Sequence, residues 1–126
     1  MVVLNFGHPI TPSQLDRLKE LTGREAEQVI EIKVQVEQDA VLKPQAVDAV
    51  DRAGLNSTQW QTAPLLISLP GYSPVAACIL AEIEGRRGNL PSIIKTRPIP
   101  GGLVTEYEVV EIINLQEVRA EARTRR

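Results

Sequence analysis

Apolar side chains gather in two short runs that predict buried strands. Residues 2–6 read VVLNF and residues 65–69 read LLISL, and glycine and proline follow each run. Continuous apolar runs of this length are typical of strands covered on both faces, as in parallel sheets. Residues 30–36 instead alternate apolar with charged or polar side chains. That period of two predicts a strand with one wetter face, near an edge of the sheet.

The segment after the first strand carries a full set of helix signals. Thr11 is a candidate N-cap, Pro12 fits the first helical position, and Gln14 is placed to close a capping box with Thr11. Leucines recur on one face of the following turns, and Gly23 fits the C-terminal cap. We therefore expect an amphipathic helix between Pro12 and Gly23.

Two further helices are expected in the middle of the chain. Pro44 is placed to begin the second helix, and Gly54 to stop it. Residues 55–62 are polar apart from one tryptophan, so we expect a loop whose tryptophan packs over the core. Ser73 is the candidate N-cap of the third helix, which is apolar nearly all round and is expected to end at Gly85.

The last third of the chain predicts a hairpin and a closing helix. Residues 92–99 and 106–113 are expected to pair as antiparallel strands around a turn at 100–102, after a loop over 85–91. Asn114 is then placed to cap the last helix. Because strands and helices alternate along most of the chain, the sequence predicts a parallel sheet with right-handed crossovers.

We therefore expect one α/β domain over residues 1–126, a Rossmann-like sheet that is mostly parallel, with a C-terminal antiparallel hairpin strand and helices on both faces. Such sheets bind ligands beyond the carboxyl ends of their strands, where the strand order switches. If the first and third strands are neighbours there, the turns at 5–9 and 69–73 meet. Each turn leads into a helix N-terminus, which favours an anion, and Gly7 and Gly71 let a ligand approach the backbone. One such glycine is more simply explained by its tight turn, whereas two converging turns favour a phosphate-bearing ligand.

Composition and charge narrow the classes of function. The 126 residues carry a formal net charge of −2, which does not support sequence-independent binding of long nucleic acid. No apolar run approaches the roughly 20 residues of a membrane span, and the chain does not begin like a signal peptide, so we expect a cytoplasmic protein. The lone cysteine, Cys78, cannot form an internal disulfide and is interpreted as a small buried hydrophobe.

The motifs of common cofactors are absent. Neither a P-loop nor GxGxxG occurs, and the chain has no CxxC and no second histidine, so we expect no nucleotide cofactor and no metal site. His8 is the only histidine and follows the first strand, where a ligand is expected. It is therefore the only candidate for acid–base catalysis near neutral pH.

Four segments resemble the Csx-fifteen family, which are small accessory proteins of type III CRISPR systems. The segments are LNFGHPIT at 4–11, LPGYSP at 69–74, GNLP at 88–91, and EIINLQ at 111–116 followed by Val118 and Arg119. The resemblance implies a domain related to the CRISPR-associated Rossmann fold that works as a two-fold dimer. It also implies binding of cyclic oligoadenylates, the second messengers made when type III complexes meet foreign RNA.

Three functions stay open at this point. The first is a binder that sequesters or senses cyclic tetra-adenylate, a ring that suits the two-fold axis of a homodimer, with larger ligand-driven assemblies as the competing arrangement. The second is a ring nuclease, which would cleave the ring without a metal by aligning a ribose 2′-hydroxyl with its neighbouring phosphate. The third is an interaction module with no nucleotide ligand. We favour the binder because His8 is the only apparent acid–base candidate near pH 7.

The expected ligand-binding residues come from the two turns and from the segment at 88–91. Tyr72 is the nearest aromatic candidate to support an adenine. The full set is Asn5, Phe6, Gly7, His8, Pro70, Gly71, Tyr72, Ser73 and Asn89.

Overall fold

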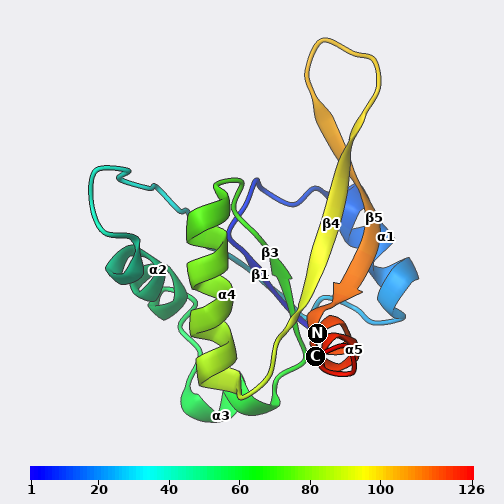
Figure 1. Cartoon of the computed structure of the whole chain (residues 1–126). Coiled ribbons are helices and arrows are strands. Elements are labelled where there is room, and N and C mark those ends of the chain that lie inside the picture. The colour runs from blue at the N-terminus through cyan, green and yellow to red at the C-terminus, as the bar shows by residue number, and fades with distance from the viewer.

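Five strands form one sheet in the order β2-β1-β3-β4-β5. The computed structural model describes all of residues 1–126, and Figure 1 shows the sheet with its helices. The first four strands run parallel, and β5 runs antiparallel to β4. The bounds are β1 (Val2–Asn5), β2 (Gln28–Glu31), β3 (Leu65–Ser68), β4 (Ser92–Ile99) and β5 (Glu106–Asn114).

The strand order reverses between β1 and β3. From β1 the chain crosses over to β2 on one side of it, and then to β3 on its other side. The first and third strands are therefore neighbours, which is the condition that the sequence left open, and this pair is the switch point of the sheet. The two turns that follow β1 and β3 consequently leave the sheet side by side.

Helices cover both faces of the sheet, which confirms the predicted fold class. Alternate residues of β1 point to opposite faces. Leu4 belongs to one buried cluster with Val50 of α2 and Ile79 of α4, whereas Val3 belongs to a second cluster with Leu18 of α1. No helix combines the length and the apolar character that a membrane crossing requires. The helices are α1 (Pro12–Thr22), α2 (Leu42–Asp51), α3 (Ser57–Thr62), α4 (Ser73–Arg87) and α5 (Leu115–Arg123).

The first helix begins and ends where the sequence predicts. The Thr11 hydroxyl accepts a hydrogen bond from the Gln14 backbone N–H at 3.2 Å, and the Gln14 side chain accepts one from the Thr11 N–H at 3.0 Å. Pro12 occupies the first turn, and Gly23 ends the helix with a left-handed φ of 69°. The capping box and the terminal glycine therefore set both ends of α1 locally.

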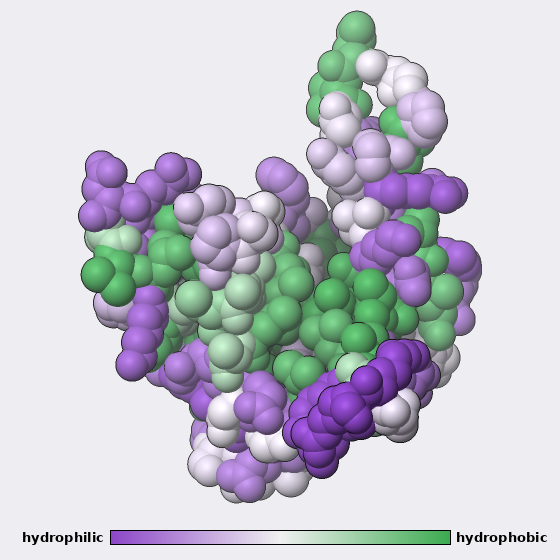
Figure 2. All heavy atoms as spheres, in the orientation of Figure 1, coloured by the Kyte–Doolittle hydropathy of each residue, from purple (hydrophilic) through white to green (hydrophobic).

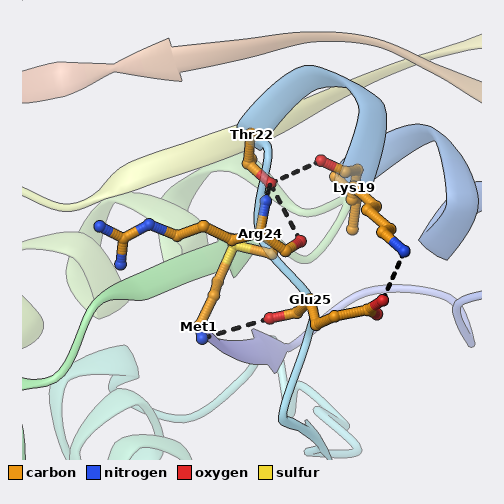
Figure 3. Close-up of polar contacts among 6 residues, drawn as sticks. Met1, Lys19, Thr22, Arg24 and Glu25 are labelled. Atoms are coloured by element: carbon orange, nitrogen blue, oxygen red, sulfur yellow. Dashed lines mark hydrogen bonds and ion pairs between the residues drawn. The ribbon is translucent and has the colours of Figure 1, made fainter.

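Hydrogen bonds hold the segment that follows α1 beside the start of β1 (Figure 3). The Thr22 hydroxyl donates to the Leu18 carbonyl oxygen at 2.7 Å and accepts from the Arg24 N–H at 3.2 Å. The amino group of Met1 donates to the Glu25 carbonyl oxygen at 3.3 Å. The Glu25 carboxylate lies 2.6 Å from the Lys19 ammonium and raises the pKa of Lys19 by hydrogen bond and charge. These contacts lie at the amino end of the sheet, opposite the turns that follow β1 and β3.

The second strand is shorter than predicted and begins earlier. The sequence predicts a strand over 30–36, but the ladder covers Gln28–Glu31. Its partner β1 ends at Asn5, so the last bond runs from the Ile32 N–H to the Asn5 carbonyl oxygen at 2.8 Å. Burial still alternates beyond that point, because Ile32 is buried while Lys33 is exposed. The period of two describes side-chain burial correctly, but pairing stops where the neighbouring strand stops.

In the middle of the chain the second helix is confirmed with shifted bounds, whereas the prediction of a loop over 55–62 is wrong. The second helix begins at Leu42, two residues before Pro44, and ends at Asp51, ahead of Gly54. Proline is tolerated there because first-turn N–H groups have no partner within the helix. The loop predicted over 55–62 contains α3, which begins with a capping box between Asn56 and Gln59. Its tryptophan, residue 60, is buried in the core as expected.

The fourth helix is longer than predicted at its C-terminal end. Its N-cap is Tyr72, one residue before the predicted Ser73, and the helix continues through Gly85 to Arg87, with Gly88 as the left-handed cap. Of the loop predicted over 85–91, only residues 88–91 lie outside the helix. Contacts beyond Gly85 outweigh the roughly 1 kcal/mol that glycine costs inside a helix. The Arg87 guanidinium donates to the carbonyl oxygens of residues 60 and 63 at 2.9 and 3.0 Å, and burial lowers its pKa.

The hairpin of β4 and β5 extends beyond the rest of the sheet (Figure 1). β3 pairs with β4 only at Ser92 and Ile93, and a bulge interrupts the β4–β5 register between Lys95 and Thr96. Beyond this bulge the two strands pair with each other alone. At the tip the side chains of Leu103 and Val104 are exposed, and Figure 2 shows apolar atoms there.

A strip of apolar surface lies beside α4, where no helix covers β4 and β5 (Figure 2). Ile93 of β4 packs against the cluster that contains Ile79 of α4, so it points to the α4 face of the sheet. Ile113 of β5 is its register partner and shares this face. Both side chains, and Leu80 of α4, are only partly buried. The α4 face of the sheet is therefore closed over β1 and β3 but open toward β5.

Candidate functional site

A cavity of about 960 Å³ opens at the carboxyl ends of β1 and β3. Residues after β1 and after β3 form its floor, Lys33 and Val34 border it after β2, and the hairpin of β4 and β5 supplies a further wall. This is the place where doubly wound sheets bind ligands. The volume lies at the upper end of the range of about 300–1,000 Å³ that is usual for ligand sites.

The structure brings together five of the nine residues expected to bind a ligand. Phe6, Gly7, His8, Pro70 and Gly71 line the cavity. They come from the two turns that the switch point places side by side, and the Phe6 N–H donates to the Ser68 carbonyl oxygen at 2.9 Å. The two predicted turns therefore form one surface.

Three other expected residues lie near the cavity without lining it. Tyr72 and Ser73 form the start of α4, directly after Gly71, and both side chains are exposed. Asn5 is fully buried beneath the first turn. Asn89 lies at the opposite end of the sheet, because α4 spans 15 residues, about 22 Å, between the cavity and the loop that holds it. Asn89 therefore takes no part in this cavity.

Asn5 organises the first turn by hydrogen bonds. Its amide nitrogen donates to the His8 carbonyl oxygen at 2.7 Å and to the Glu31 carboxylate at 2.6 Å, and its side-chain oxygen accepts from the Gly7 N–H at 2.9 Å. The second Glu31 oxygen accepts from the Ile10 N–H at 3.5 Å. Every polar atom of the Asn5 side chain has a partner within the protein. Its role is thus to hold the loop that presents His8.

Gly7 and Gly71 are glycines for different reasons. A Cβ on Gly7 would lie 2.8 Å from the Leu69 carbonyl oxygen and 3.3 Å from the Ser68 hydroxyl. The close approach of the two turns therefore requires glycine at residue 7. A Cβ on Gly71 would meet nothing within 4 Å, and Gly71 is not among the glycines with positive φ. The fold does not require a glycine at residue 71, and the space that its missing side chain leaves faces the cavity.

Alanine substitutions should separate these two glycines. We expect Gly7→Ala to lower the free energy of unfolding by about 1–3 kcal/mol, because the added methyl group displaces a backbone carbonyl. Gly71→Ala should leave the free energy of unfolding within about 0.5 kcal/mol of the original protein. Urea denaturation of both variants measures the difference. Equal stabilities would show that the two turns can move apart freely.

The two helix N-termini beside the cavity are not equivalent. The capping box satisfies the first turn of α1 internally. The N-cap of α4, Tyr72, makes no side-chain hydrogen bond to the helix, so the N–H groups of Ser73 and Val75 have no side-chain cap. The sequence predicts an anion at both helices, whereas the geometry leaves the start of α4 as the better of the two places.

The charged residues on the cavity wall are few. Lys33 and Glu106 are the only lining residues with a full charge at neutral pH, and Lys33 forms no ion pair with another side chain. The pattern at 30–36 places Lys33 on the wetter side of a strand but does not connect it with the site. The only sequence feature that could have connected Lys33 with the site is its position, just after the strand that pairs with β1.

An aromatic pair bridges the cavity from the first turn to the hairpin. The rings of His8 and Tyr107 are nearly parallel, with an interplanar angle of 14° and centroids 6.2 Å apart. The Gln14 amide nitrogen donates to the Tyr107 carbonyl oxygen at 2.9 Å. The sequence gives no sign of Tyr107 and predicts Tyr72 as the aromatic residue of the site. Only the register of β4 and β5 brings residue 107 across to residue 8.

Comparison of the chain with protein-family models, with curated proteins and with solved structures found no match. The function is accordingly inferred from the sequence and from this cavity.

Proposed function

We propose that this protein binds cyclic tetra-adenylate in the cytoplasm, and so sequesters or modulates the second messenger of type III CRISPR antiviral signalling. The observation that carries the proposal is the cavity at the β1–β3 switch point, which joins both predicted turns to an uncapped helix N-terminus. The resemblance of four sequence segments to the Csx-fifteen family supplies the choice of ligand. Of the four segments, those at 4–11 and 69–74 contain the two turns that line the cavity.

The cavity offers suitable partners for a nucleotide. A phosphate placed beyond Gly71 would accept hydrogen bonds from the first turn of α4 and benefit from the helix dipole. Lys33 supplies a positive charge and forms no ion pair with a carboxylate of the protein. Apolar lining residues such as Leu69 and Ile99 can contact a base. The site thus combines an anion-binding corner with an apolar wall.

We propose further that two copies share one ring. Cyclic tetra-adenylate contains four equivalent nucleotides, and an isologous dimer would present each set of contacts twice. Binding across the two-fold axis would stabilise the dimer, because the ligand prefers the paired state.

A second candidate function is metal-independent cleavage of the same ring. His8 lines the cavity, and its imidazole makes no hydrogen bond within the protein, so it is free to accept a proton from a ribose 2′-hydroxyl. That hydroxyl would attack the adjacent phosphorus to form a 2′,3′-cyclic phosphate, and the displaced 5′-oxygen would take up a proton and leave as a hydroxyl group. Because His8 is the only candidate in the cavity for acid–base catalysis near neutral pH, we favour binding over cleavage.

The deciding experiment incubates the purified protein with radiolabelled cyclic tetra-adenylate. A retained, intact ring at a stoichiometry of one per dimer, with unchanged mass by light scattering, supports the binder. Linear products that accumulate over many turnovers establish the ring nuclease. A ligand-driven increase in mass would replace the shared-ring dimer by a larger assembly. Absence of binding to any cyclic oligoadenylate would leave an interaction module with no nucleotide ligand.

A further inference from the structure

We propose that a second copy of this chain covers the apolar strip beside α4, with the two-fold axis of the dimer running along the strands. The strip is formed by Leu80, Ile93 and Ile113, which are only partly buried because no helix covers β4 and β5 on this face. The inference rests on the proposed function for the pairing of two copies. It deepens that proposal, because it names the surface through which the copies meet.

α4 borders the strip with a carboxylate that has no partner. Glu82 and Arg86 mark the flank of α4 that faces α2, because the Arg86 guanidinium lies 2.8 Å from the Asp51 carboxylate. Residues two apart in a helix are separated by about 200° around its axis. Leu80 and Glu84 therefore lie on the opposite flank, toward β4 (Figure 1). Glu84 is half-buried and forms no ion pair within the chain.

α5 borders the other side of the strip with a strongly hydrophilic surface (Figure 2). The Gln116 side-chain oxygen accepts from the Leu90 N–H at 3.0 Å, so this face of α5 is turned toward the loop that follows α4. Arg119 and Arg123 lie three and seven residues after Gln116 and share its face. Both arginines are exposed and form no ion pair. The strip thus lies between one unpaired carboxylate and two unpaired guanidinium groups.

A two-fold axis along the strip brings these opposite charges together. The rotation places the α4 border of one copy over the α5 border of the other, while the two apolar strips face each other. The charges are at a similar height along the strands, because Glu84 lies in the last turn of α4 and the Leu90–Gln116 hydrogen bond joins the end of α4 to the start of α5. Each Glu84 then faces Arg119 and Arg123 of the partner subunit. The same axis leaves both cavities at one end of the dimer.

The interface also accounts for two sequence segments that the cavity leaves unused. Residues 88–91 and 111–116 lie at the opposite end of the sheet from the cavity, and the hydrogen bond between Leu90 and Gln116 joins them. The second segment contributes Ile113 to the strip and leads into α5. Both segments therefore border the surface that the second copy would cover.

The first test measures dimer dissociation by analytical ultracentrifugation, without ligand, in two charge-reversal variants. Glu84→Lys, and separately Arg119→Glu combined with Arg123→Glu, would each place like charges opposite each other across the axis. We expect each variant alone to dissociate at least about 10-fold more readily than the original protein. An equimolar mixture of the two should regain dimers, because both contacts of the mixed pair then join opposite charges.

Arg24→Glu is the matched control, because Arg24 is exposed, forms no ion pair and lies after α1 on the other face of the sheet. It should leave the dissociation constant within threefold. Reversal variants that dimerise as tightly as the original protein, or a mixture that stays monomeric, would overturn the interface. An unmodified protein that stays monomeric both with and without cyclic tetra-adenylate would overturn it too.

A second measurement needs no variant. Because salt screens exposed charges, the dissociation constant of the unmodified dimer should rise several-fold from low to high salt. A dissociation constant that is independent of salt would overturn the charge pairing. Binding of cyclic tetra-adenylate is measured separately. Dimers restored by mixing, in a protein that binds no cyclic tetra-adenylate, would support the interface and reject the proposed function, whereas binding without this dimer would do the reverse.

Discussion

Replacement of Asn5 by aspartate should lower the free energy of unfolding by about 3–5 kcal/mol, although the two side chains have nearly the same shape. The Asn5 amide nitrogen donates to the Glu31 carboxylate at 2.6 Å and to the His8 carbonyl oxygen at 2.7 Å, and the residue is fully buried. Asn5→Asp puts an oxygen in place of that nitrogen. Two carboxylates then face each other, and the His8 carbonyl loses its donor. Urea denaturation at pH 7 measures the effect.

A second variant, in which Glu31 is replaced as well, distinguishes loss of the Asn5–Glu31 hydrogen bond from general disruption of the core. In the double variant Asn5→Asp with Glu31→Gln, the new glutamine amide can donate to the aspartate, so the pair is restored with its polarity reversed. We expect the double variant to regain about half of the lost stability, since the His8 carbonyl stays without a donor. A double-mutant cycle should give a coupling of at least about 1–2 kcal/mol. Additive effects would mean that Asn5 and Glu31 do not interact in solution.

Gly71→Val should reduce the affinity for cyclic tetra-adenylate by more than 100-fold while the protein stays folded. A Cβ at this position meets no protein atom within 4 Å and the backbone φ is not positive, so the substitution causes no clash at the Cβ. Because Gly71 lines the cavity just before α4, we expect the added methyl groups to obstruct the approach to the first N–H groups of that helix. Binding titrations with the labelled ring, together with thermal unfolding, separate loss of binding from loss of structure.

Gly85→Ala is a suitable control for that variant. Gly85 also has open space at its Cβ, but it lies inside α4 and outside the cavity. Its substitution should leave binding unchanged and stabilise the helix by up to about 1 kcal/mol. A folded Gly71→Val protein with the original affinity would remove this turn from the binding site.

Features that depend on neighbouring residues in the chain could be predicted from the sequence. The capping box and terminal glycine of α1 are local interactions, and they define both ends of that helix. The parallel sheet follows from the alternation of strands and helices, whereas the strand order that makes β1 and β3 neighbours comes only from the structure. Features that depend on distant partners were missed. The second strand ends early because β1 ends at Asn5, and α4 passes Gly85 because Arg87 reaches the carbonyl oxygens of α3 and the residue after it.

The residues of the candidate site likewise fall into those that could be predicted from the sequence and those that could not. The two turns lie where the strand pattern places them, so Gly7, His8 and Gly71 could be named from the sequence. Asn5 stands in the same turn, but its role is visible only once Glu31 of β2 lies beside it. Tyr107 enters the site from the last strand, through a hairpin register and a bulge that local patterns do not specify. A position close to the two turns in the sequence therefore does not identify the aromatic ring that lines the cavity.

The bulge between Lys95 and Thr96 lies in the part of the hairpin where β4 and β5 pair only with each other. The cavity wall that they form therefore has no third strand beside it, whereas β1 and β3 each pair on both sides. The Gln14 amide, which donates to the Tyr107 carbonyl oxygen, and the burial of Val109 with Leu18 join this wall to α1 instead. The width of the cavity on this side is therefore set by contacts with a helix rather than by the sheet.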